Sequence, residues 1–163
     1  MAGHYDTNGV GAIRQPHRSH GRRSSDLVSD ARLTHVFPEA RLIAQAESIN
    51  VGMPAARRSA LKELAAAAAA DSNLFRPFGT IEEAIARLRT IRGVGEWTAQ
   101  YIALRALRES DAFPAADIGL LRGAEVVDGA RPSVPNLLLR SESWRPWRAY
   151  AAQHLWAAGS TYA

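Results

Sequence analysis

The sequence contains no cysteine, and Lys62 is the only lysine among its 20 basic residues. The absence of cysteine excludes both a disulfide framework and a thiolate metal site. Long apolar runs are missing as well: no stretch approaches the roughly 20 residues that cross a bilayer, and the first residues lack the apolar segment of a signal peptide. From these absences we expect a soluble protein with a cytoplasmic location and no membrane partner.

Positive charge in this chain is carried almost entirely by arginine, and the formal net charge is +4. Guanidinium groups form bidentate contacts with phosphate, which is compatible with a nucleic-acid partner. A GC-rich genome that favours arginine codons would produce the same composition, so charge alone identifies no partner.

The chain divides by composition at about residue 30. Residues 1–30 are rich in Gly, His, Arg, Ser and Asp and show no sustained helical period, which predicts a disordered or divergent leader. His4, His17 and His20 have no acidic or cysteine partner at a spacing that would complete a metal site. Residues 31–163 are expected to form one helical domain.

Helical texture begins at Leu33 with a short apolar entry up to Pro38, and no segment after it alternates as a strand would. Thr80 and Glu83 have the spacing of a capping box. The Gly- and Pro-rich stretch from Asp128 to Pro135 predicts a loop. The expected helices are 38–49, 54–70, 80–88, 96–107, 117–124 and 144–158. The predicted fold class is all-α.

A Gly93-Val94-Gly95 turn separates two of these helices, which makes a helix-hairpin-helix. Backbone N–H groups at such a turn, together with the N-terminus of the next helix near Thr98, can approach a phosphate oxygen because glycine has no Cβ. A tight turn without any ligand is the alternative. Carbonyl oxygens of the turn could also hold a monovalent cation; the candidates are Arg89, Ile91 and Val94.

An aromatic pair and an acid follow the turn. Trp97 and Tyr101 lie one helical turn apart and can share a face, although aromatic residues at this spacing are usually core. Asp117 opens the next helical segment, where it would serve as an N-cap. Asp111, which precedes Phe113, is interpreted as a loop or capping acid.

Five blocks of sequence, in order and at compatible spacings, resemble the 3-methyladenine DNA glycosylase II family of the helix-hairpin-helix glycosylase superfamily. The resemblance extends from about Leu33 to Trp156. The blocks are Leu33–Pro38, Gly52–Arg58, Gly93–Leu107, Asp111–Asp117 and Trp144–Ala151.

The resemblance implies a DNA repair enzyme that flips a damaged nucleotide into a pocket and hydrolyses its N-glycosidic bond during base excision repair. By this resemblance, Asp117 stabilises a transition state that is similar to an oxocarbenium ion. Trp97, Tyr101 and Trp156 would line the pocket, because electron-rich rings suit a positively charged alkylated base. The implied enzyme is a nucleoid-associated monomer that acts on damaged double-stranded DNA and requires no cofactor.

Glycosylases that also nick the strand use an amine, commonly a lysine just beyond the hairpin. Trp97 occupies that position here, and Lys62 belongs to another helix. The resemblance therefore implies a monofunctional enzyme that leaves an abasic site.

The resemblance does not extend to the β-rich domain and the DNA-wedging helix with which the family normally begins. Residues 1–30 take the place of that helix, and residues 126–135 are irregular for the family. We therefore expect a truncated or divergent member. Two alternatives follow: a catalytically inactive remnant that still binds DNA through its hairpin, and a non-functional fragment.

Overall fold

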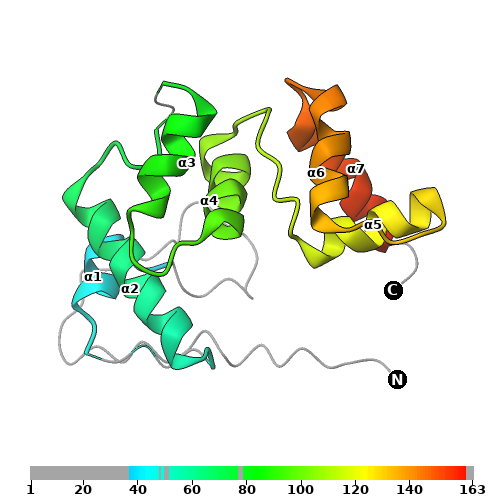
Figure 1. Ribbon diagram of the computed structural model, residues 1–163. Helices are drawn as coiled ribbons and strands as arrows, with labels where there is room; N and C mark the ends of the chain where they lie inside the picture. Colours follow the sequence, from blue (N-terminus) through cyan, green and yellow to red (C-terminus); the bar gives the residue numbers. More distant parts are fainter. Residues whose placement is uncertain (1–36, 48, 50–51, 77–78, 161–163) are drawn as a thin grey trace, which may run out of the picture. The chain divides into compact units, whose positions relative to one another are not determined.

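The structure, a computed structural model, describes residues 37–160 except 48, 50–51 and 77–78. The predicted leader and the Leu33–Val36 part of the first block lie outside the described residues. Every regular element in the described ranges is helical, so the all-α prediction is confirmed (Figure 1). Among the same residues no helix is both long and apolar enough to cross a membrane.

The described residues divide into two compact units, one that ends at Ser72 and one that begins at Asn73. The first unit contains α1 (Ala40–Gln45) and α2 (Ala55–Ala70). The second contains α3 (Ile81–Arg89), α4 (Glu96–Ile102), the π-helix η2 (Ala103–Leu107), α5 (Ile118–Asp128), α6 (Val134–Ser141), the 3-10 helix η3 (Glu142–Trp144) and α7 (Arg148–Ser160).

In the first unit α1 packs against α2 around Ile43, Ile49 and Ala65, which are all buried. The helix that the sequence predicts through Ile49 ends earlier, because Ala46 is extended (φ −60°, ψ 127°). Because the chain turns at Ala46, Ile49 packs into the same core as Ile43 and Ala65. Lys62 Nζ donates to the Ala46 carbonyl oxygen at 2.7 Å and stabilises the bend.

The predicted capping box at the start of α3 is confirmed. Glu83 N–H donates to Thr80 Oγ1 at 3.2 Å, and Thr80 N–H donates to Glu83 Oε2 at 2.9 Å. Helix α4 continues to Leu107 as predicted, but its last turn widens into the π-helix η2 and stops at Arg108, whose φ is +61°.

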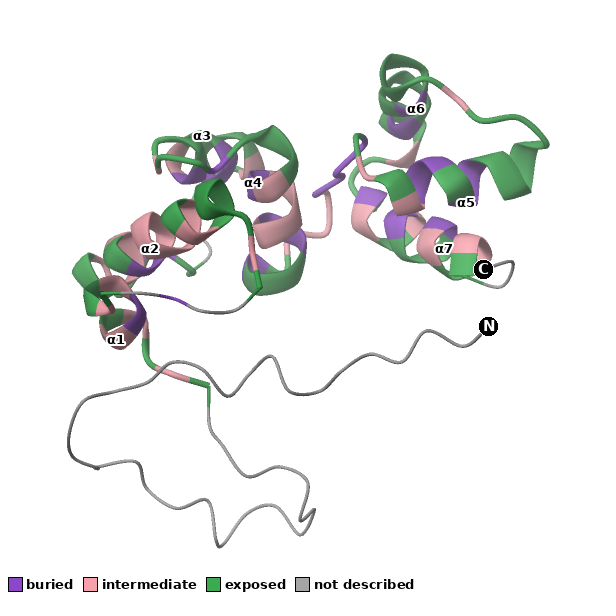
Figure 2. Cartoon of the chain, turned by 90° about the horizontal axis from the view of Figure 1, so that it is seen from below, coloured by how far each residue is buried: buried purple, intermediate pink, exposed green. Residues whose placement is uncertain are grey.

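Helices α5 and α7 form the closest pair in the second unit, and the two ribbons lie side by side in Figures 1 and 2. Gly123 makes this approach possible: a Cβ on it would lie 1.8 Å from the Leu155 carbonyl oxygen. Gly159 faces the same point from α7, where a Cβ would lie 3.1 Å from Gly123 N. Helix α5 extends beyond the predicted end at Ala124 because no glycine or proline lies between Ala124 and Gly129. Gly129 ends the helix with a φ of +76°.

The loop predicted from Asp128 to Pro135 is confirmed for residues 129–133, but the sequence prediction misses helix α6, which follows it. Helix α6 starts where Ser133 Oγ accepts from Asn136 N–H at 3.3 Å. Helix α7 begins at Arg148 rather than Trp144. Pro146 explains the late start, because the residue before a proline avoids the helical region, and Arg145 is extended (φ −59°, ψ 141°).

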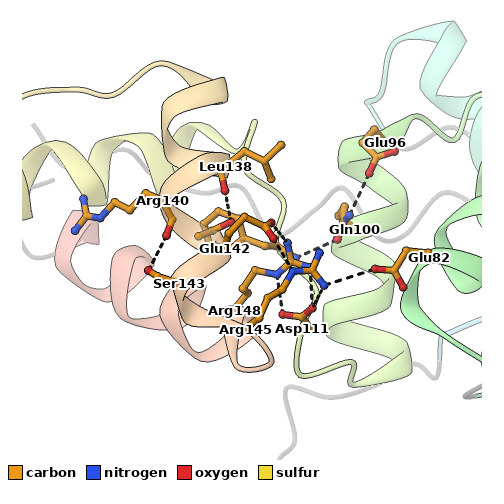
Figure 3. A network of polar contacts seen from close by, with 12 residues as sticks. Glu82, Glu96, Gln100, Asp111, Leu138, Arg140, Glu142, Ser143, Arg145 and Arg148 are labelled. Atoms are coloured by element: carbon orange, nitrogen blue, oxygen red, sulfur yellow. Dashed lines mark hydrogen bonds and ion pairs between the residues drawn. The ribbon is translucent and has the colours of Figure 1, made fainter.

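An ion network attaches the connection before α5 to the start of α7 (Figure 3). The buried Arg148 pairs with Asp111 through two contacts, Nε–Oδ1 at 2.7 Å and Nη2–Oδ2 at 2.8 Å, and Arg145 Nη1 reaches Asp111 Oδ2 at 2.8 Å. Desolvation opposes the charge on Arg145, but its hydrogen bond to Glu142 and the charges of Asp111, Glu142 and Glu82 raise its pKa above the ordinary value. The interpretation of Asp111 as a loop acid is confirmed.

The same connection is also attached to α4. Gln100 Oε1 accepts from Phe113 N–H at 3.0 Å, and Gln100 Nε2 donates to Glu96 Oε1 at 3.1 Å. The segment that leads to Asp117 is therefore held by α4 on one side and by α7 on the other.

Candidate functional site

The Asp117 carboxylate accepts hydrogen bonds from three different elements. Its Oδ1 accepts from Leu120 N–H at 3.1 Å, which is the N-cap bond of α5, and from Trp156 Nε1–H of α7 at 2.8 Å. Its Oδ2 accepts from Trp97 Nε1–H of α4 at 3.0 Å. Asp117 is thus an N-cap whose carboxylate is held in one orientation by three N–H donors, and no cationic side chain pairs with it among the described residues.

The three predicted pocket aromatics lie together. The rings of Trp97 and Tyr101 stack at a centroid distance of 5.5 Å and an interplanar angle of 23°. Tyr101 meets Trp156 edge-on at 6.0 Å and 69°. Trp97 is 43% exposed and the other two are half-buried, so these rings form a surface rather than a sealed core.

These aromatics and Asp117 line one pocket of about 540 Å³. All four residues that the sequence and the resemblance indicated are therefore brought together. The full lining is Trp97, Tyr101, Arg105, Asp117, Gln153, Trp156 and Ser160.

Sequence reasoning missed three lining residues, Arg105, Gln153 and Ser160. Arg105 follows Tyr101 by four residues, and its guanidinium carbon lies 5.8 Å from the centre of the Tyr101 ring. Gln153 and Ser160 flank Trp156 at distances of three and four residues along α7. Extending the helical spacing from the aromatic residues would have found all three, since such neighbours share a face.

Gly119 was also missed, and it provides space for the site. A Cβ on Gly119 would lie 2.8 Å from Trp156 Cδ1 and 2.9 Å from Asp117 Oδ1. Only glycine therefore lets the Trp156 indole reach the Asp117 carboxylate in this arrangement.

We expect Gly119→Ala to break the hydrogen bond between Trp156 and Asp117 while the chain stays folded. The new methyl group displaces the indole, whereas replacing glycine by alanine within a helix favours the helix by up to about 1 kcal/mol. The indole N–H resonance of Trp156 should shift by NMR, and Trp156→Phe should identify that resonance by removing it. An unchanged resonance in Gly119→Ala would contradict this role.

The hairpin between α3 and α4 has the expected form. Val94 N–H donates to the Ile91 carbonyl oxygen at 3.0 Å, and Gly93 has a φ of +87°, which favours glycine. Gly95 differs, because its φ is −86° and a Cβ on it would meet nothing within 4 Å. The fold itself does not require glycine at position 95.

The remaining hairpin candidates are placed around this turn. Gly93 and Gly95 are exposed, Thr98 is half-buried on α4, and the Val94 side chain is buried. Gly95 caps α4 without any side-chain acceptor, so the first N–H groups of α4 receive no cap from a side chain. The turn thus presents backbone donors to the outside.

The three carbonyl groups predicted to hold a cation are compatible with that role. The Ile91 oxygen accepts from Val94 N–H and keeps its second lone pair. The oxygens of Arg89 and Val94 accept none of the hydrogen bonds found in the described part of the turn. Whether they bind a cation stays a prediction.

Comparison with known proteins identifies relatives of one kind, although no family model matches the sequence. The chain is 39% identical over 124 residues to the "Probable bifunctional transcriptional activator/DNA repair enzyme AlkA" of Mycobacterium tuberculosis, and this alignment covers 76% of this chain and 25% of the relative. It is 35% identical over 108 residues to "DNA-3-methyladenine glycosylase 2" of Escherichia coli, and this alignment covers 65% of this chain and 36% of the relative.

A solved structure matches in three dimensions as well. The 3-methyladenine DNA glycosylase Mag1 of Schizosaccharomyces pombe, in complex with abasic DNA, superimposes with a TM-score of 0.63 at 29% identity and covers 74% of this chain and 62% of the solved chain. This chain therefore spans a quarter to about a third of the length of the two curated relatives. The matched part, 76% of the chain, belongs to the 3-methyladenine DNA glycosylase family.

Proposed function

We propose that this chain is a monofunctional DNA glycosylase that hydrolyses the N-glycosidic bond of alkylated bases of the 3-methyladenine type in double-stranded DNA. One observation carries the proposal: the Asp117 carboxylate is held by the indole N–H groups of Trp97 and Trp156 at the wall of an aromatic pocket. The family of the matched region supports the same chemistry.

In the proposed reaction, a flipped base stacks against the aromatic rings and its sugar lies near Asp117. As the C1′–N bond breaks, its electron pair passes to the base, and positive charge develops on the sugar. The fixed carboxylate stabilises that charge, because it needs no reorientation during the reaction. Water then adds to C1′ and loses a proton, so the products are the free base and an abasic site.

Strand cleavage does not belong to the proposed reaction. The described lining of the pocket contains no lysine, so it offers no side-chain amine that could form a Schiff base with the sugar. Lys62 donates to a backbone carbonyl in the first unit. The abasic product is therefore expected to stay intact.

The hairpin, Gly93 to Thr98, is proposed to hold a DNA phosphate through the backbone N–H groups of Gly93, Gly95 and Thr98, whereas Val94 N–H closes the turn on the Ile91 carbonyl oxygen. A monovalent cation bound by the carbonyl groups of Arg89, Ile91 and Val94 would add positive charge beside that phosphate.

We expect Gly95→Asp to weaken duplex binding by about tenfold or more, because it places a negative charge where the phosphate would approach. Binding is measured as the Kd for a duplex that carries a non-cleavable abasic analogue, at fixed salt. Ala130→Asp adds the same charge at an exposed turn outside the hairpin and is the matched control. Equal weakening by both variants would argue against a phosphate site at the hairpin.

The direct test of the proposal incubates the chain with methylated duplex DNA and measures the released bases. Release without strand cleavage is the expected result. A chain that melts cooperatively and binds duplex DNA but releases nothing would instead support the inactive DNA-binding alternative.

A further inference from the structure

The pocket contains a positive charge that has no ionic partner in the described part of the chain. Arg105 lines the pocket, and its guanidinium carbon lies 5.8 Å from the centre of the Tyr101 ring. No ion pair or hydrogen bond joins the Arg105 side chain to another described residue. The Arg105 guanidinium group therefore borders the pocket and is exposed to solvent.

Asp117 does not neutralise this charge by contact. Both of its oxygens accept from uncharged N–H groups, those of Trp97, Trp156 and Leu120. The pocket thus holds a negative and a positive group at separate positions: the carboxylate between the two indoles, and the guanidinium beside Tyr101.

This arrangement should affect the binding of cationic and neutral bases to different extents. A base that carries a permanent positive charge is attracted to an aromatic face, but Arg105 already places a cation beside the Tyr101 ring. Two like charges in one pocket repel each other, whereas a neutral base stacks on the same rings without this repulsion.

We propose that Arg105 sets the selectivity of the pocket between cationic and neutral bases by weakening the binding of cationic ones. The inference rests on the proposed function, since it assumes that the pocket binds a base. Arg105 is exposed, so solvent and salt screen its charge, and the expected effect on relative affinity is about three- to tenfold.

The test compares two free purines of similar shape, the neutral 9-methyladenine and the permanently cationic 7,9-dimethyladeninium. Each is titrated into the full chain, and binding is followed by the indole N–H resonances of Trp97 and Trp156. The ratio of the two affinities is measured for the wild type, Arg105→Gln and Arg105→Lys. Arg122→Gln removes an exposed arginine of α5 that does not line the pocket and is the matched control.

Arg105→Gln should shift the affinity ratio about three- to tenfold toward the cationic purine, while Arg105→Lys and Arg122→Gln should keep the wild-type ratio. High salt should reduce the difference in ratio between the wild type and Arg105→Gln, because salt screens the one charge by which the two proteins differ. A change of shape alone would alter Arg105→Lys as well, and the difference between the proteins would not depend on salt.

An equal ratio in the wild type and Arg105→Gln would overturn the inference, and so would the absence of any indole shift with either purine. Failure of the proposed function is a separate result. A wild type that releases no base from DNA but binds both purines with the predicted ratio would refute the glycosylase activity and keep the role of Arg105.

Discussion

Asp117→Asn is expected to reduce base release by roughly 100-fold or more, because it removes the only carboxylate in the described lining of the pocket. The neutral amide cannot balance the positive charge that develops on the sugar. It also replaces one acceptor oxygen with an NH₂ group. Because Oδ1 must stay an oxygen to keep the cap bond from Leu120 N–H, the NH₂ group takes the Oδ2 position and Trp97 loses its partner. The rate is measured in single turnover with methylated duplex DNA.

Binding and folding should survive this substitution. Asparagine is as good an N-cap as aspartate, so the cap bond to Leu120 N–H is kept and the melting temperature should change little. Duplex affinity should remain close to that of the wild type. Turnover by Asp117→Asn equal to that of the wild type would eliminate the catalytic role.

The other acid of this region provides a comparison. Asp111 pairs with the buried Arg148, and Asp111→Asn breaks that pair. Its effect should appear as a lower melting temperature, since the buried Arg148 then keeps only its contact with Glu142, at 3.1 Å, and loses both contacts with a charged Asp111. The two substitutions should therefore separate cleanly: loss of rate at Asp117 and loss of stability at Asp111.

Gly123→Ala is expected to lower the free energy of unfolding by about 3 kcal/mol, at the upper end for an overpacked contact. Its Cβ would lie 1.8 Å from a backbone oxygen of Leu155, which cannot move away as a side chain could. Helices α5 and α7 must separate, and Trp156 then moves away from Asp117. Denaturant unfolding and base release should both be affected.

Gly95→Ala is the matched control for stability. A Cβ there meets nothing within 4 Å and its backbone is in an ordinary region, so the only cost is that alanine is a poorer N-cap than glycine, by up to about 1 kcal/mol. Its unfolding free energy should therefore fall by no more than about 1 kcal/mol. A Gly123→Ala protein as stable as Gly95→Ala would show that α5 and α7 do not pack as closely as described.

Much of the fold could be predicted from sequence because its signals are local. The Thr80–Glu83 capping box and the Gly93–Gly95 turn each depend on residues within one or two helical turns. Helix α6 was missed, although Ser133 followed by Pro135 is a helix-start signal, because the glycines and prolines around it are equally typical of a loop.

The candidate site was predictable only in part. Trp97 and Tyr101 share a face through their spacing on one helix, and Asp117 is recognisable as an N-cap. Trp156 was assigned by the family resemblance alone, since it is 39 residues beyond Asp117 and no local pattern connects them. Arg105 was not assigned, because its position on a helix does not reveal that its face borders a pocket.

The sequence by itself determined where α3, α4 and α5 begin, which turn could present backbone donors, and which acid follows the hairpin. The tertiary structure decided what that acid contacts. Asp117 receives one hydrogen bond from its own helix and two from α4 and α7, and the bond from α7 depends on the absence of a side chain at Gly119. Periodicity describes each helix separately, whereas the pairing of the carboxylate with both indoles depends on how closely α5 and α7 pack.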